Sequence, residues 1–209
     1  MNTKPDPFID GLVVQLAPVT PMKASAGLGG AAASLAVAIV MVVALMGLRR
    51  DISALFLLSS GLFLLLGAAA SLSVIMMGRP SVGSEHGGWV WAAAMAALLP
   101  ATTLLMGVTH GPAAWTESDP ETGVLCLAMG LLFGLVTGGV LVAWLRRGAP
   151  TSPERAGLLT GIAAGSFGIF AFSLHCPSND LYHIGLWHSL AVVVAAMIGR
   201  LAVPRLIRW

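Results

Sequence analysis

The sequence predicts an all-α integral membrane protein, a bundle of six transmembrane helices with both termini in the cytoplasm. Of its 209 residues, 57% are hydrophobic and only 10% are charged, whereas soluble domains carry about 25% charged residues. The apolar residues gather in six segments of about the 20 residues that a membrane crossing needs. Strict alternation over about ten residues, which is typical of membrane β-barrel strands, is missing. The composition therefore excludes a water-soluble fold.

The first segment, residues 1–23, is predicted to be a cytosolic arm that carries a short amphipathic helix. Asp6 is placed to cap this helix and Pro7 fits its first turn. Pro18 and Pro21 end the helix before the membrane. One apolar stripe fits the helical period: Phe8, Ile9, Leu12, Val13 and Leu16. The arm is either a docking helix for a cytosolic protein or an interfacial helix that packs below the bundle, and both interpretations stay open.

Six transmembrane spans follow, separated by charged, proline-containing or polar breaks. Their expected ranges are 24–48, 53–77, 89–108, 122–145, 156–174 and 186–203. A short cytosolic tail, residues 204–209, closes the chain. The predicted organisation is thus an arm (1–23), a transmembrane domain (24–203) and a tail.

The distribution of Lys and Arg predicts the orientation of these spans. Nine of the eleven cations fall on the side that holds both termini, and Arg49 and Arg50 are the other two. Because cytoplasmic loops carry the excess of Lys and Arg, both termini are expected in the cytoplasm. The two arginines of the first outer loop are the exception, and Asp51 partly neutralises them.

The two cysteines are predicted to lie at the non-cytoplasmic face. Cys126 falls about one helical turn inside that face, or roughly 6 Å deep, and Cys176 lies at the outer end of the fifth span. Four of the five histidines and one carboxylate share this side: His110, His175, His183, His188 and Asp180. Reactive side chains therefore gather on one face.

Small residues recur every four positions in the fourth and fifth spans. The stripes are Cys126, Gly130, Gly134 and Gly138 in the fourth span and Gly157, Gly161 and Gly165 in the fifth. Such stripes let helices approach closely in lipid. If the two spans pack through them, Cys126 and Cys176 are expected to meet.

Three interpretations of this cluster remain open. The thiols close to a disulfide on an oxidising face, or they bind a soft or borderline ion such as copper(I), zinc or cadmium. The expected metal ligands are Cys126, Cys176, His188 and His183, with His175 next. In the third interpretation the cysteines are small apolar core residues and the histidines are solvated in loops.

Several other functions are disfavoured. No span carries a charged residue away from its ends, so a coupled ion transporter is not expected. No nucleotide-binding loop, hydrolase elbow or metalloprotease motif occurs, and no basic run suggests nucleic-acid binding. We expect a protein that is not an enzyme and that needs no obligatory cofactor.

Several short motifs follow one another in a fixed order along the chain. They are Ile9-Asp10-x-Leu12 with Leu16-Ala17-Pro18-Val19, a cysteine early in the fourth span, Arg146-Arg147-Gly148-Ala149-Pro150, His175-Cys176-Pro177, Leu186-Trp187-His188 and Arg208-Trp209. In this order they resemble the motifs of the NrsF family of bacterial membrane anti-sigma factors. The resemblance implies a six-span inner-membrane protein that holds an extracytoplasmic-function sigma factor inactive. It assigns sigma binding to the segment from Phe8 to Leu16, where Gly11 departs as a weak helix former. It implicates Cys126 and Cys176 in the response to metal or oxidative stress.

Together these observations predict a signalling protein. Metal binding or oxidation at the cysteines is expected to repack the last three spans and to change the affinity of the arm for the sigma factor. The alternative is a membrane metal-binding or thiol-redox protein without a sigma partner.

Overall fold

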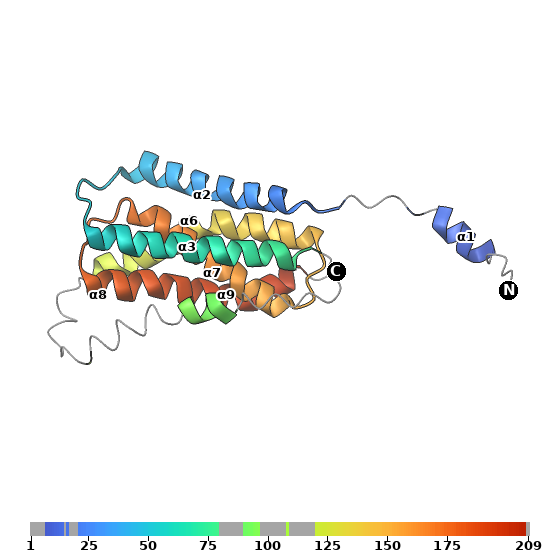
Figure 1. Ribbon diagram of the computed structural model, residues 1–209. Helices are drawn as coiled ribbons and strands as arrows, with labels where there is room; N and C mark the ends of the chain where they lie inside the picture. The colour runs from blue at the N-terminus through green and yellow to red at the C-terminus, as the bar shows by residue number, and fades with distance from the viewer. Residues whose placement is uncertain are drawn as a thin grey trace.

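The structure is a computed structural model that describes residues 7–14, 16, 21–79, 90–96, 108 and 120–207, and all regular secondary structure in these ranges is helical. The helices are α1 (Pro7–Val14), α2 (Ala24–Met46), α3 (Ala54–Met77), α6 (Pro120–Arg147), α7 (Pro153–Ser173), α8 (Leu181–His183), the π-helical segment η1 (Ile184–His188) and α9 (Ser189–Leu206). In Figure 1 the long helices run side by side and α1 stands apart from them.

Within the described ranges, five helices are long and apolar enough to cross a membrane: α2, α3, α6, α7 and the continuous run from α8 to α9. Five of the six predicted spans are therefore observed as helices. The third predicted span, residues 89–108, lies mostly outside the described residues, although residues 90–96 and Val108 are helical. The last helix starts five residues before the expected 186 and ends at Leu206, three residues beyond the expected 203.

The bundle has two distinct ends. At one end α2 ends, α3 begins, α6 begins and α7 ends, and we call it the cysteine end because Cys126 and Cys176 lie there. At the opposite end, which we call the arm end, α2 begins and α9 ends, close to one another in the view of Figure 1. The reactive side chains and the attachment of the N-terminal arm are thus separated by the length of the bundle.

Helix α7 is the centre of the bundle. In an apolar 18-residue window of α7, 89% of the residues are buried, against 22% in the corresponding window of α2. Helices α3, α6 and α9 all pack against α7. Helix α7 is therefore enclosed by its neighbours, whereas α2 lies at the periphery.

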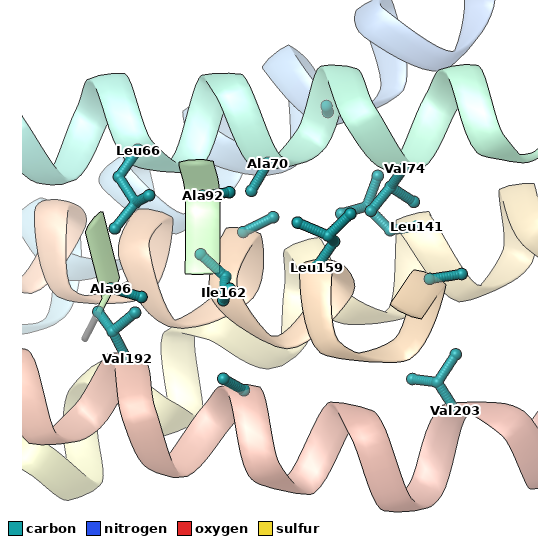
Figure 2. Packing of buried hydrophobic residues seen from close by; sticks show 14 of the residues in the cluster. Leu66, Ala70, Val74, Ala92, Ala96, Leu141, Leu159, Ile162, Val192 and Val203 are labelled. Atoms are coloured by element: carbon teal, nitrogen blue, oxygen red, sulfur yellow. The ribbon is translucent and has the colours of Figure 1, made fainter. Parts of the chain in front are cut away.

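The main core is a layer of aliphatic side chains between α3, α6, α7 and α9 (Figure 2). Leu66 and Val74 of α3 face Leu159 and Ile162 of α7, and Val192 of α9 closes the layer. The helical residues 90–96 also join it through two buried alanines, Ala92 and Ala96. The described part of the third predicted span therefore packs against the core through one face, while Val90, Trp91 and Met95 are exposed.

Glycines allow the closest helix contacts. A Cβ on Gly168 of α7 would overlap the carbonyl oxygen of Gly130 on α6, and a Cβ on Gly134 would press on the Ala164 carbonyl. The stripe of α6 therefore does pack against α7, as expected.

The expected role of the α7 stripe was wrong. Gly157, Gly161 and Gly165 face α9, where Ala195 and Gly199 approach them. The α7 surface that meets α6 carries positions 164 and 168 instead. At 100° per residue, each of these positions lies about 60° around the helix from the stripe position three residues before it.

Candidate metal and thiol site

Cys126 is held at the cysteine end by the packing of α6. It lies six residues after the start of α6 and is 2% exposed. Nearby, a Cβ on Gly123 would overlap the indole ring of Trp187. Gly123 therefore lets η1 approach α6 closely, and this approach brings the histidines of the last helix toward Cys126.

Cys176 is placed by the turn that ends α7. The backbone N–H groups of His175 and Cys176 both donate to the carbonyl of Phe172, at 2.9 and 3.1 Å. This turn directs the Cys176 side chain into the interior, where it is 1% exposed. It contacts a small cluster that also contains Phe133, Phe172 and Cys126.

His183 and His188 are positioned by the irregular start of the last helix. Asp180 caps α8 by accepting a hydrogen bond from the His183 backbone N–H at 2.7 Å. The π-helical segment that follows pairs residues five apart, so it turns His183 and His188 toward one side, where an α-helix would separate them by about 140°. Their rings meet edge to face with centroids 5.5 Å apart.

These four side chains converge on one point. The Sγ atoms of Cys126 and Cys176 are 3.6 Å apart, and the Nε2 atom of His183 lies 3.3 Å from the first and 3.7 Å from the second. One ligand atom of each of the four residues lies within 4.8 Å of all the others. All four residues are buried. The predicted proximity of the two thiols is therefore observed.

The spacing of the donors fits a tetrahedral soft-metal site. Metal–sulfur distances of about 2.3 Å and metal–nitrogen distances of about 2.0–2.1 Å place tetrahedral ligands roughly 3.6–3.8 Å apart. The three separations above, 3.3, 3.6 and 3.7 Å, are close to these values. The Nε2 atom of His188 is buried without a hydrogen-bond partner, a state that costs free energy unless a ligand satisfies the atom. The residues present therefore fit an ion such as copper(I), zinc or cadmium.

The same thiols are also within reach of disulfide formation. Both are reduced, and closing a bond of about 2.05 Å requires the sulfurs to approach by about 1.5 Å. Hydrogen bonding with the Cys126 thiol, together with His183 and His188, lowers the pKa of Cys176 below that of an ordinary thiol, although burial acts in the opposite direction.

The structure does not bring every expected ligand into this group. His175 lies outside it: its Nδ1 atom is 3.2 Å from the carbonyl oxygen of Gly47, and its ring packs on Phe172. His110 lies outside the described residues. The interpretation of the histidines as solvated loop residues was wrong for His183 and His188, which are 2% and 3% exposed.

Three positioning residues were missed in the sequence. The sequence places Asp180 on the same face only as a carboxylate. The signal for its capping role is an Asp three positions before His183, at the start of the last helix. Gly123 and Trp187 fit together through a contact 64 residues apart in the chain, and no local pattern indicates it.

The residues expected to bind a partner are exposed, in contrast to the four buried residues of the cysteine end. Phe8, Ile9, Leu12 and Val13 of α1 are 72%, 55%, 51% and 56% exposed, and Leu16 beyond its end is 73% exposed. Exposed apolar residues in one short segment are typical of a surface that binds another protein.

A family model described as "Negative regulator of sigma F", NrsF, matches residues 12–209. The chain belongs to the NrsF family. It is 34% identical over 157 residues to the anti-sigma-F factor NrsF of Caulobacter vibrioides, a match that covers 69% of this chain and 68% of that protein. It is 27% identical over 191 residues to the probable anti-sigma-F factor NrsF of Azospira oryzae, covering 88% and 86% of the two chains. No solved structure matches.

Membership of the NrsF family makes this protein a negative regulator of a sigma factor and thus a regulatory protein of a non-enzymatic kind. Its several apolar helices are those of a membrane protein. The alternative of a metal-handling membrane protein without a sigma partner is therefore displaced by the family assignment.

Proposed function

We propose that this NrsF protein is an inner-membrane anti-sigma factor that binds an extracytoplasmic-function sigma factor through its N-terminal arm and releases it when Cys126 and Cys176 bind a soft metal ion. The single observation that carries the proposal is the convergence of four buried donor atoms, from Cys126, Cys176, His183 and His188, within 4.8 Å. Within this set the Nε2 atom of His188 is buried without a hydrogen-bond partner, which is costly unless a ligand satisfies the atom. A sensing role gives it a purpose.

The proposed topology places the cysteine end on the periplasmic side. Seven of the described cations lie at the arm end, and two lie at the cysteine end; the seven are Lys23, Arg79, Arg146, Arg147, Arg155, Arg200 and Arg205. This asymmetry supports a cytoplasmic arm end. Helix α3 ends at the arm end, α6 begins at the cysteine end, and the described residues 90–96 between them in the sequence form an apolar helix. These observations support a sixth crossing and both termini in the cytoplasm.

The proposed sigma-binding element is the arm. Its apolar residues from Phe8 to Leu16 are exposed, and a short amphipathic helix suits binding in a groove of a cytosolic partner. A sensor that faces the periplasm reports on conditions outside the cytoplasm. We therefore expect the partner to be a sigma factor of the extracytoplasmic-function class.

The proposed signal acts on the last three helices. Cys126 belongs to α6, Cys176 follows α7, and His183 and His188 belong to the start of the last helix. Drawing these four side chains onto one ion fixes the three elements relative to one another. Release then requires the arm to bind the sigma factor less tightly in that arrangement, because a ligand shifts only an equilibrium in which it binds two states differently.

The experiment compares the wild type with Cys126→Ser/Cys176→Ser in membranes that hold the sigma factor. We expect the wild type to release sigma on addition of cadmium, and the double variant to bind sigma normally and to retain it. Gly139→Ala is the control, because a Cβ there meets no atom within 4 Å. Cadmium-dependent release from the double cysteine variant would contradict the sensor assignment.

A disulfide is the second candidate signal, favoured by the 3.6 Å separation of the two sulfurs. In that reaction the two thiols lose two protons and two electrons to an oxidant such as a peroxide, which is reduced to water. Release by peroxide with loss of both free thiols, and no release by cadmium, would assign the signal to oxidation.

A further inference from the structure

The loop between α2 and α3 is attached to the segment that carries Cys176 by a set of hydrogen bonds centred on Asn179. The Oδ1 atom of Asn179 accepts from Arg49 Nη2 and from Ser53 Oγ, each at 2.6 Å. Its Nδ2 group donates to Asp51 Oδ2, also at 2.6 Å. We call these four residues, Arg49, Asp51, Ser53 and Asn179, the Asn179 clamp. It joins residues that are 126–130 positions apart in the chain.

Two further contacts extend the clamp along the chain just before Cys176. The Arg49 N–H donates to the carbonyl of Leu174 at 2.8 Å, and the Gly47 carbonyl oxygen lies 3.2 Å from Nδ1 of His175. Gly47 ends α2 with φ +84° and ψ 173°, a conformation that side-chain-bearing residues rarely adopt. The residue that ends α2 is therefore in direct contact with the segment that carries the sensor cysteine.

Arg49 is the structural member of the Arg49-Arg50 pair. Its guanidinium lies 4.3 Å from the centre of the Phe56 ring, in the first turn of α3, in addition to its bond with Asn179. Arg49 is half-buried, whereas Arg50 is exposed. This gives a reason for a cation on the side of the membrane where Lys and Arg are otherwise few.

We propose that the Asn179 clamp is the coupling element that transmits the state of the Cys126–Cys176 site to α2 and so to the arm. The inference rests on the proposed sensing function and deepens it. Asn179 lies three residues after Cys176, and Arg49 lies three residues after the end of α2. A change in the position of Cys176 therefore acts on α2 through these contacts.

Helix α2 has the properties that such a transmission needs. It has 23 residues and thus a length of about 34 Å, which spans the bundle from the cysteine end to the arm end. It is also the least buried of the five span helices, with 22% of its window buried, so displacing it disturbs little of the core. The arm precedes it directly in the chain. Asn179 and Arg49 are positioning residues that act through α2.

The test uses an exchange of amide and carboxylate across the clamp. Asn179→Asp places a second carboxylate against Asp51, so the two repel one another. Adding Asp51→Asn restores complementary partners: the amide at position 51 then donates to the carboxylate at position 179, which still accepts from Arg49 and Ser53. The exchange therefore reverses the direction of one hydrogen bond and keeps the others.

The full-length protein with its sigma factor, in membranes, is challenged with cadmium, and retained sigma is measured. Arg50→Ala is the matched control, because it removes a neighbouring positive charge outside the clamp. Three quantities are measured on each variant. They are the sigma factor bound before cadmium is added, the fraction of thiols that cadmium protects from a thiol-alkylating reagent, and the sigma factor released after cadmium is added.

We expect the wild type and the Arg50→Ala control to weaken their hold on sigma about tenfold when cadmium binds, within the usual range of coupling between two sites. Asn179→Asp should bind sigma and protect its thiols as the wild type does, yet weaken its hold on sigma less than about twofold. The double variant should recover release.

Each other outcome overturns the inference. Normal release from Asn179→Asp shows that the clamp does not transmit the signal. Failure of the double variant to recover release, with sigma binding and thiol protection intact, shows that the hydrogen bonds are not the coupling contacts. If cadmium neither protects the thiols nor releases sigma in the wild type, the sensing function itself is wrong, and this result is distinct from failure of the clamp alone.

Discussion

The cysteine end and the N-terminal arm hold their functional side chains in opposite environments. At the cysteine end, Cys126, Cys176, His183 and His188 are each at most 3% exposed, and their donor atoms lie within 4.8 Å. In the arm, every apolar side chain from position 8 to position 14 that the structure describes is at least half exposed. One site is assembled within the chain, whereas the other presents an exposed apolar surface.

In the proposed function, this difference separates the task of sensing from the task of binding the sigma factor. A buried, closely packed site responds to a small ion and excludes large molecules. An exposed amphipathic segment gains its stabilisation on binding a protein and is regulated by how it is presented. Changes at the two places should therefore have separable effects.

Deletion of residues 1–19 should abolish sigma binding, because it removes the exposed apolar residues while leaving the bundle intact. Sigma retained on the purified protein should fall at least tenfold, a loss of about 1.4 kcal/mol or more. Thiol protection by cadmium should be unchanged. Gly11→Ala is the matched control: a Cβ there meets nothing within 4 Å, and it should favour helix by up to about 1 kcal/mol. Undiminished sigma binding after the deletion would exclude the arm as the binding element.

Gly168→Ala should destabilise the bundle and with it the cysteine end. The added methyl group would overlap the Gly130 carbonyl of α6, and overpacking of this kind costs about 1–3 kcal/mol. Thermal unfolding of the detergent-purified protein measures the loss. Gly139→Ala, the same chemical change in open space, should leave the unfolding temperature equal or higher. Equal behaviour of the two variants would show that α6 and α7 do not approach through Gly168.

Asp180→Ala should weaken metal binding without removing a ligand. The substitution removes the carboxylate that accepts a hydrogen bond from the His183 N–H, and loss of such a cap costs about 1 kcal/mol. If the cap positions His183, cadmium affinity should fall about fivefold. Asp180→Asn keeps a capping oxygen and should bind cadmium nearly as tightly as the wild type. Competition with a chelator measures the affinities, and equal losses in both variants would point to the charge of Asp180 instead of its cap.

Thr137→Val should have the smallest effect, because it removes one buried hydrogen bond between α6 and α2. The hydroxyl groups of Thr137 and Ser34 are 3.0 Å apart, and Ser34 also donates to Ala31. Bonds of this kind between membrane helices contribute about 0.6 kcal/mol on average. Ser73→Ala, whose hydroxyl donates to a carbonyl of its own helix, is the control in the same unfolding assay. A loss of unfolding free energy several times larger than this would mean that the hydrogen bond holds α2 to the bundle more firmly than the low burial of α2 implies.

The sequence predicted the five spans that the structure describes as long apolar helices, because length and apolar composition determine whether a segment can cross a membrane. It missed the start of the last helix by five residues, since Asp180, Tyr182 and His183 look like a polar loop in a hydropathy pattern. The structure reveals the cap and the π-helical segment that bury the two histidines.

Long-range contacts account for the remaining differences in the site. His175 is adjacent to Cys176 in the chain, yet its ring turns to Gly47, which no local pattern reveals. The α7 glycine stripe was recognised, but a stripe does not specify which neighbouring helix it meets. The Asn179 clamp joins two polar segments more than 120 residues apart, so its members had no visible relation in the sequence.

A cadmium titration of the purified complex, with bound metal and retained sigma factor measured in the same samples, tests metal-dependent release most directly. We expect one ion bound per chain and sigma release that rises in proportion to site occupancy. The Cys126→Ser/Cys176→Ser variant should neither bind the ion nor release sigma. Full occupancy of the site with sigma still bound, or release from the variant without the thiols, would contradict this expectation.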